Sequence, residues 1–231
     1  MKTIGVIGGM SWESSLEYYR LLNEGARARL GGLHSARILL DSLDFAPVEA
    51  LQAAGDWAAA GRMMAEAALR LERGGADCVV LATNTMHKCA AEIESAVSIP
   101  LLHIADAAGR RIRADGRARV GLLGTRFTME EDFYAGRLAE KFGLDVLVPA
   151  QEARSLVHRV IYDELCLGIT RDESRRAYAA VIAELGRRGA EAVILGCTEI
   201  GLLVGPRDSA LPLYDTTRIH VEAALDFALQ G

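Results

Sequence analysis

Short apolar runs alternate along this chain with longer stretches in which apolar residues recur every three or four positions. Runs of the first kind, rich in Val, Ile and Leu, are typical of buried strands, whereas the second periodicity predicts amphipathic helices. Predicted strands occupy residues 3–7, 36–40, 78–81, 99–103, 119–123, 145–148, 192–195 and 211–215. Predicted helices occupy residues 16–30, 56–73, 87–97, 129–142, 152–165, 174–187 and 216–230. Alternation of this kind predicts an α/β protein with mainly parallel sheets covered by helices.

The second half of the chain repeats phrases of the first half in the same order. The phrase IGVIGG is matched later by VGLLGT, GADCVVLATNT by GAEAVILGCTE, and IPLLH by LPLYD. Three matched phrases in one order indicate two similar α/β lobes, which we expect to be related by a pseudo-twofold axis. The first lobe is expected to comprise residues 1–103 and 216–231, and the second residues 104–215.

Small polar residues follow the buried run in each copy of the central phrase. In an open parallel sheet, ligands bind beyond the carboxyl ends of the strands, and a helix N-terminus there can hold an anion on its free N–H groups. If the lobes face each other, Thr83 and Cys197 lie on opposite walls of one cleft. That arrangement suits inversion of a carbon centre, because a proton can leave from one face and return from the other. The polar residues concerned are Thr83, Asn84 and Thr85 in the first copy and Cys197, Thr198 and Glu199 in the second.

Composition narrows the class of protein. With 231 residues, 51% of them hydrophobic, the chain is long enough to bury a substantial core. A net charge of −5 gives no basic footprint, so we expect neither nucleic acid nor an anionic membrane as a partner. The start of the chain runs directly into a strand pattern, and no apolar stretch reaches the roughly 18 residues that span a bilayer, so a cytoplasmic location is expected. The four cysteines include no C-x-x-C pair, and no metal site is expected.

Three motifs together resemble those of the aspartate/glutamate racemase superfamily over essentially the whole chain. They are MKTIGVIGGMSWES at the start, TNTMH in the first half and GCTEIGLL in the second. The resemblance implies two Rossmann-like lobes with the active site in the cleft between them. It also implies an isomerase that interconverts L- and D-amino acids by two-base α-proton abstraction, one thiol coming from each lobe. No cofactor is then expected, because this mechanism needs neither pyridoxal phosphate nor a metal. The resemblance also implies a homodimer.

The two positions that match the family's thiols differ in this chain. Cys197 matches the second thiol, which in related racemases acts on the L-enantiomer, and Thr83 replaces the first. A free thiol has a pKa of about 8.5, and a helix N-terminus lowers it, so a thiolate is accessible to Cys197 near neutral pH. A threonine hydroxyl is a far weaker acid. Thr83 is therefore expected to bind the substrate or to deliver a proton through water, which predicts an L-biased or slow racemase.

Two further positions bear on the choice of substrate. Strict aspartate racemases commonly place basic residues after the second strand and in a helix before a glycine, to hold the side-chain carboxylate. Val48 and Cys166 stand in the corresponding stretches here. Without an Arg or Lys at these points, a distal carboxylate has no evident partner. We therefore expect aspartate, glutamate or a broader set of amino acids as substrates.

Residues expected to bind the substrate come from several loops of both lobes. Asn84, Thr85 and Thr198 would hold the α-carboxylate on backbone N–H groups, and Thr125 is the repeat partner of Gly9. The full set is Met10, Ser11, Gln52, Asn84, Thr85, Thr125, Thr128, Thr198 and Glu199.

Each of these assignments has an ordinary structural alternative. Thr83 could be a helix N-cap, Gln52 a solvated helix residue and Glu199 the start of a helix. His87 is expected in solvent or at an interface, with tuning of Thr83 as the alternative. The remaining cysteines, Cys78, Cys89 and Cys166, are expected to be structural.

Other functions remain open from the sequence. A decarboxylase or a cis–trans isomerase of a small dicarboxylic acid needs only one cysteine, and Thr83 would then bind the substrate. A non-catalytic amino-acid-binding protein would bind the ligand without exchanging its α-proton. A nucleotide-binding protein is disfavoured, because the chain contains neither a Walker A sequence nor a dinucleotide fingerprint.

Overall fold

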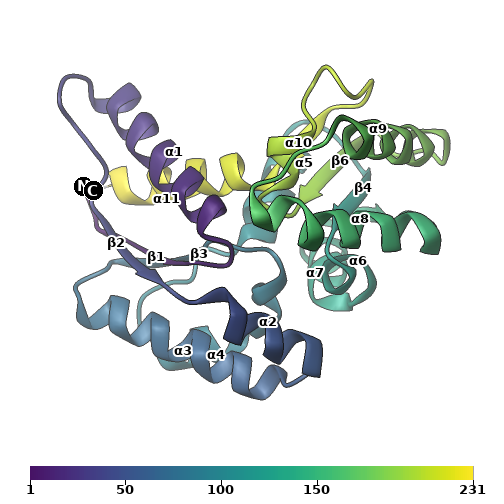
Figure 1. Cartoon of the computed structure of the whole chain (residues 1–231). Helices are drawn as coiled ribbons and strands as arrows, with labels where there is room; N and C mark the ends of the chain where they lie inside the picture. The colour runs from purple at the N-terminus through teal and green to yellow at the C-terminus, as the bar shows by residue number, and fades with distance from the viewer. Residues whose placement is uncertain (231) are drawn as a thin grey trace. The chain divides into compact units, whose positions relative to one another are not determined.

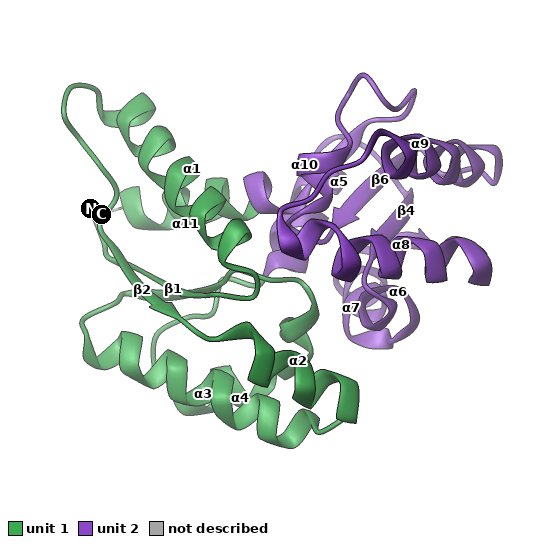
Figure 2. Ribbon diagram, in the orientation of Figure 1, with its two compact units in different colours: residues 1–103, 220–231 green, residues 104–219 purple. Residues whose placement is uncertain are grey.

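The chain folds into two compact units, which a computed structural model describes for residues 1–230 (Figures 1 and 2). The first unit comprises Met1–His103 and the chain from His220 onward, and the second comprises Ile104–Ile219. The division falls inside the last helix, α11 (Thr216–Leu229), whereas the expected boundary was at the start of that helix. Among residues 1–230, no helix is both long enough and apolar enough to cross a membrane.

A three-stranded parallel sheet forms the centre of the first unit. Its strands are β1 (Ile4–Gly8), β2 (Ile38–Ser42) and β3 (Cys78–Leu81), arranged in the order β2-β1-β3. The strand expected over residues 99–103 is reduced to a single bridge between Leu101 and Val79. Pro100 has no N–H group with which to extend that ladder.

Strict alternation along β1 builds two separate cores in the first unit. Ile4 and Val6 project to one face and pack against α1 (Trp12–Leu30) and α11. Ile7 projects to the other face, towards α3 (Trp57–Arg73), because successive side chains of a strand point in opposite directions. Figure 1 shows α1 and α11 on one side of this sheet and α3 and α4 on the other.

The helices that cover the second face include one that the sequence pattern did not predict. This helix, α2 (Phe45–Ala54), begins where the Asp44 side chain accepts a hydrogen bond from the Ala46 N–H, and it ends at Gly55 in the left-handed conformation. The helix expected over residues 87–97 begins as a 3-10 turn, η1 (Thr85–Cys89), and continues as α4 (Ala90–Ala96).

The second unit is built on a four-stranded parallel sheet. The strands are β4 (Arg119–Gly124), β5 (Asp145–Leu147), β6 (Ala192–Gly196) and β7 (Leu213–Asp215), in the order β5-β4-β6-β7. Both sheets are therefore parallel and flanked by helices, which confirms the predicted α/β class.

Helices pack on the sheet of the second unit through large apolar side chains. Leu123, Val193 and Leu195 belong to one buried cluster with residues of the helices that follow β5 and β6. Helix α5 was not predicted; it packs closely on α7, since a Cβ at Gly109 would come within 2.4 Å of the Phe142 ring. The helical segments are α5 (Ile104–Ala114), α6 (Arg126–Glu130), α7 (Asp132–Phe142), α8 (Gln151–Asp163), η2 (Leu165–Leu167), α9 (Asp172–Arg187) and α10 (Ile200–Leu203).

Candidate active site

Cys197 lies directly after β6, with its side chain only 8% exposed. Its Sγ donates a hydrogen bond to Oε2 of Glu199 at 2.9 Å. The hydroxyl of Thr198 donates to the same carboxylate oxygen at 2.7 Å. Glu199 is itself buried, so this carboxylate faces a thiol and a hydroxyl in a region of low dielectric. The thiol and both oxygen-bearing side chains thus lie together within the second unit.

The surroundings of Cys197 oppose ionisation of its thiol. Burial raises the pKa of the Cys197 thiol well above its ordinary value, and the Glu199 carboxylate raises it further by repelling a thiolate. The following helix, α10, has only four residues, and its N-terminus does not outweigh these effects. Both effects favour the protonated thiol, which donates its hydrogen bond to Glu199.

Two threonines lie at the same edge of the second sheet as Cys197. Gly124 at the end of β4 is paired in register with Gly196 at the end of β6, so the residues that follow these two strands are neighbours. Thr125 caps α6: its hydroxyl accepts a hydrogen bond from the Thr128 N–H and lies 3.2 Å from the Thr128 hydroxyl. The structure thus brings five predicted residues to one sheet edge: Thr125, Thr128, Cys197, Thr198 and Glu199.

The backbones of the two strand ends approach each other closely at these glycines. A Cβ at Gly124 would lie 2.7 Å from the carbonyl oxygen of Gly196, and a Cβ at Gly196 would lie 2.8 Å from the carbonyl oxygen of Leu123. Neither position has room for a side chain. The position of Cys197 is therefore set by main-chain contacts.

Thr83 occupies the equivalent place after β3 in the first unit and is also 8% exposed. Its carbonyl oxygen accepts a hydrogen bond from Nδ1 of His87 at 2.8 Å. Because a carbonyl can only accept, Nδ1 of this imidazole must carry the hydrogen. His87 is 2% exposed, so the expectation that it lies in solvent is wrong. The N-cap position of η1 belongs to Asn84, not to Thr83, so the alternative of Thr83 as an N-cap is also wrong.

Met10 and Ser11 follow β1 at the same edge of the first sheet as Thr83. Ser11 caps α1, where its hydroxyl accepts a hydrogen bond from the Ser14 N–H. The Ser14 hydroxyl donates to the Ser11 carbonyl at 2.9 Å and reaches the Ala82 carbonyl at 3.5 Å, which ties the end of β1 to the end of β3.

Gln52 lies on α2 and is buried, contrary to the alternative of a solvated helix residue. Its side-chain amide donates to Sδ of Met86 at 3.0 Å, within the 3-10 turn that includes Thr85. The structure therefore places Gln52 against the segment that follows Thr83 and Asn84.

The sequence reasoning missed a group of buried imidazoles behind Thr83. The rings of His87 and His103 have their centroids 4.4 Å apart. His220 on α11 donates from Nε2 to the Leu102 carbonyl, and its Nδ1 meets the Tyr18 hydroxyl at 2.8 Å. Because a carbonyl only accepts, Nε2 carries a hydrogen, and in that neutral tautomer Nδ1 accepts from the Tyr18 hydroxyl. One signal for this group is present in the sequence, the position of His87 four residues after Thr83. His220 offers none, because it is distant from Thr83 along the chain.

The two positions that were compared with the basic residues of strict aspartate racemases carry no charge. Val48 is fully buried on α2, and Cys166 is half-buried on η2, against the apolar cluster that includes Cys197. The other two cysteines, Cys78 and Cys89, are buried, and burial raises the pKa of each thiol to about 12. Their thiols are therefore inert at neutral pH.

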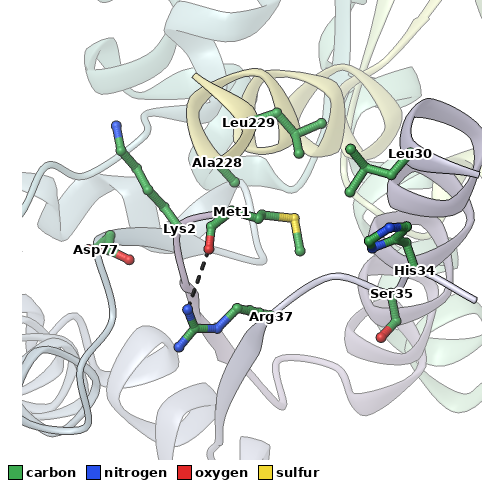
Figure 3. Close-up of a pocket in the computed structure, with 9 residues that line it drawn as sticks. All are labelled: Met1, Lys2, Leu30, His34, Ser35, Arg37, Asp77, Ala228 and Leu229. Carbon is green, nitrogen blue, oxygen red and sulfur yellow. Dashed lines mark hydrogen bonds between the residues drawn. The ribbon is translucent and has the colours of Figure 1, made fainter. Parts of the chain in front are cut away.

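A separate pocket of about 780 Å³ lies at the opposite edge of the first sheet (Figure 3). Lys2 and Asp77, which line it, stand just before β1 and β3, so the pocket is at the amino ends of these strands. Arg37 donates to the Met1 carbonyl there at 3.5 Å. None of the predicted site residues lines this pocket. Within residues 1–230, no group of three or more His, Cys, Asp or Glu side chains is arranged to hold a metal ion.

Comparisons with known proteins agree with the resemblance. The sequence profile of the Asp/Glu/Hydantoin racemase family matches residues 7–224. A crystal structure from Yersinia pestis, described as a candidate Asp/Glu racemase, is 53% identical, with a TM-score of 0.92 and 100% of both chains covered. An aspartate racemase homologue from Pyrococcus horikoshii OT3 is 33% identical, with a TM-score of 0.83 and 99% of both chains covered.

A curated relative, the glutamate racemase of Parafrankia sp. (strain EAN1pec), is 32% identical over 190 residues. The match covers 76% of this chain and 65% of that relative's length. The family profile spans nearly all of the described residues, including both sheet edges that carry the predicted site. The chain therefore belongs to the Asp/Glu/Hydantoin racemase family.

Proposed function

We propose that this protein is an amino-acid racemase that uses neither pyridoxal phosphate nor a metal and acts on aspartate, glutamate or a broader set of amino acids. Family membership supports this activity, and so does the chemistry at the two sheet edges. The observation that carries the proposal is the buried thiol of Cys197 at the carboxyl end of β6, 2.9 Å from the Glu199 carboxylate. Thr83 occupies the equivalent place after β3.

In the proposed reaction, Cys197 removes the α-proton of the L-enantiomer. The thiol must first lose its own proton, and Oε2 of Glu199 is the acceptor that already receives its hydrogen bond. Charge then develops on the substrate carboxylate as the α-carbon is deprotonated. Backbone N–H groups at Asn84, Thr85 and Thr198 are the groups that we expect to stabilise this charge.

Thr83 supplies the other face of the substrate with a neutral hydroxyl. An alcohol is too weak an acid to act as an ionised base near neutral pH, so delivery of a proton through water or simple binding is its proposed role. The enzyme should therefore exchange the α-proton of L-amino acids faster than that of D-amino acids. Val48 and Cys166 add no charge that would select a distal carboxylate, which favours a broader set of side chains.

We further propose that the protein acts as a homodimer in the cytoplasm, as the family resemblance implies. Small amino acids are its proposed partners, with Met10, Ser11, Gln52, Thr125 and Thr128 among the groups that contact them. Each of these side chains is buried near the end of its unit's sheet or against the turn that follows it.

Proton NMR in D2O tests the proposal directly. The full chain is incubated with L- and D-aspartate, L- and D-glutamate and a panel of other amino acids, without pyridoxal phosphate, and chiral chromatography follows each sample. Loss of the α-proton signal with inversion supports a racemase, and loss from the L-form with retention shows that Cys197 acts alone. No exchange with any amino acid would refute the proposal.

A second candidate function rests on the replacement of one thiol by Thr83. A decarboxylase or a cis–trans isomerase of a small dicarboxylic acid needs a single thiol and a second group that only binds. Release of CO2, or a change at a double bond, without α-proton exchange would favour that function. Thermal stabilisation by an amino acid without any turnover would indicate a binding protein.

A further inference from the structure

Helix α1 carries two apolar stripes, of which only one is covered by the rest of the chain. The inner stripe, which includes Tyr18, Leu22 and Ala26, is buried on the first sheet. Trp12, Leu16 and Tyr19 form a second stripe, spaced four and three residues apart, and are 64%, 59% and 54% exposed. A surface helix normally presents polar residues to solvent on every side except its core face. We therefore expect another protein chain to cover the outer stripe.

The exposed apolar surface continues beyond the end of α1. Leu30 is 42% exposed and Leu33 is fully exposed. Gly31 and Gly32, both with positive φ, form the turn between them, where nothing lies within 4 Å of either Cβ position. We call this surface the α1 patch; its apolar members are Trp12, Leu16, Tyr19, Leu30 and Leu33.

A groove of about 600 Å³ lies beside these side chains, between α1 and the turn that follows it. Leu16, Tyr19 and Leu33 line the groove together with polar residues that include Asn23 and Arg27. The same face therefore has both projecting apolar side chains and a hollow to receive them. A surface that meets its own copy across a twofold axis needs this self-complementarity.

The size of the α1 patch matches what a dimer requires. Fully exposed aromatic side chains offer about 150–250 Å² each, so the five side chains together expose roughly 600 Å² of apolar surface. A monomer rarely exposes an apolar patch of more than a few hundred Å². A standard interface buries about 800 Å² per partner, of which about 60% is apolar. The apolar area of the α1 patch is therefore large enough to provide the apolar part of one partner's side of a standard interface.

The sequence of α1 allows a second copy of α1 to cover this stripe in an antiparallel register. The positions of Trp12 and Arg27, of Leu16 and Asn23, and of Tyr19 and Arg20 are symmetric about a point between Tyr19 and Arg20. Two antiparallel copies of α1 thus bring Trp12 of one protomer to Arg27 of its partner, a favourable cation–π pair.

The charges along α1 are compatible with this pairing. Arg20 is ion-paired with Glu17 at 2.6 Å and with Glu24 at 2.7 Å, so the positive charges of two Arg20 copies are offset at the centre. Arg27, by contrast, makes no ion pair among residues 1–230. The indole ring of a second protomer would give its guanidinium a partner.

We propose that the α1 patch is the twofold interface of a homodimer in which two α1 helices pack antiparallel. This inference identifies the surface of the dimer proposed above and does not depend on racemase activity. Trp12 follows Ser11 directly, so the interface also borders the segment that we expect to contact the substrate.

Sedimentation velocity of the full chain, from about 0.1 to about 50 µM, tests the interface. We expect a dimer for the wild type and a dissociation constant raised at least ~100-fold by Leu16→Glu or Tyr19→Glu, since each buries a charge in the twofold interface. The matched control is Leu167→Glu on η2, whose leucine is 64% exposed outside the patch and whose variant should remain dimeric. Circular dichroism establishes that each variant is folded.

A double-mutant cycle with Trp12→Ala and Arg27→Ala tests the antiparallel pairing. These residues lie about 22 Å apart along one helix, so they can couple only across two protomers. Non-additive effects on dimerisation are expected. A wild type that stays monomeric, or a Leu16→Glu variant as dimeric as the wild type, would overturn the interface. Strict additivity in the cycle would overturn the pairing. Neither result would bear on α-proton exchange, which is measured separately.

Discussion

Replacing Glu199 by glutamine changes one property of the proposed base, the charge beside it. The substitution Glu199→Gln preserves the size of the side chain and leaves an oxygen that can still accept the hydrogen bond from Cys197. It removes the negative charge whose acceptor oxygen lies 2.9 Å from Sγ. Because that charge raises the pKa of the thiol, its removal must lower the pKa of Cys197.

The expected effect is large enough to measure. At an effective dielectric constant of about 20, two unit charges 2.9 Å apart repel each other by about 6 kcal/mol. Relaxation and water reduce this value, but a quarter of it is already about 1.4 kcal/mol, which is a tenfold change in an equilibrium constant. The thiolate population at a fixed pH below the pKa should therefore rise at least about tenfold. Burial still acts on the thiol, so its pKa should remain above the ordinary value.

Ultraviolet absorbance of the thiolate, recorded against pH, provides the assay. The difference between Glu199→Gln and the double variant Glu199→Gln/Cys197→Ser isolates Cys197. Cys78 and Cys89 contribute little, because burial holds the pKa of each at about 12. The same pair of titrations with Glu199 intact gives the reference. A titration midpoint that stays in place or moves to higher pH would show that the Glu199 carboxylate does not control this thiol.

Three further predictions concern the catalytic positions and the buried imidazoles. Cys197→Ser should reduce α-proton exchange at least ~1000-fold with an unchanged thermal midpoint, since an alcohol cannot replace a thiolate base; exchange near the wild-type rate would exclude Cys197 as the base. Thr83→Cys should raise the exchange rate of D-amino acids relative to L-amino acids in D2O, and an unchanged ratio would contradict the equivalence of the two sheet edges. Tyr18→Phe removes the hydroxyl that meets Nδ1 of His220 and should lower the free energy of unfolding in urea by about 1–3 kcal/mol. A loss of less than about 0.5 kcal/mol would show that this hydrogen bond adds little to stability.

Most strands of the fold were predictable because parallel strands buried on both faces are continuous apolar runs. The helices that escaped prediction have physical reasons for doing so. In α2, Pro47 and a nearly uniform apolar composition hide the helical period. Helix α5 begins at Ile104 directly after the segment expected as a strand, so no turn signal separates the two.

The candidate site was predictable in position but not in its electrostatics. The repeated phrase located Thr83 and Cys197 at the ends of strands, where the structure places them. The raised pKa of Cys197 depends first on the burial of its thiol and then on how the Glu199 side chain turns towards Sγ, and the helix that follows is only four residues long. Neither side-chain direction nor helix length could be read from the letters GCTE. His220 escaped notice because only tertiary folding brings α11 to Leu102.

The close approach of Gly124 and Gly196 limits how the site can change. A methyl group at either position would push the main chain aside and shift Cys197 with it. Variants that change the substrate range without moving this main chain must therefore arise elsewhere, and we expect them at positions such as Val48 and Cys166, which stand where strict aspartate racemases commonly have basic residues. For directed evolution of new substrates, libraries should leave the two glycines fixed and place diversity on α2 and η2.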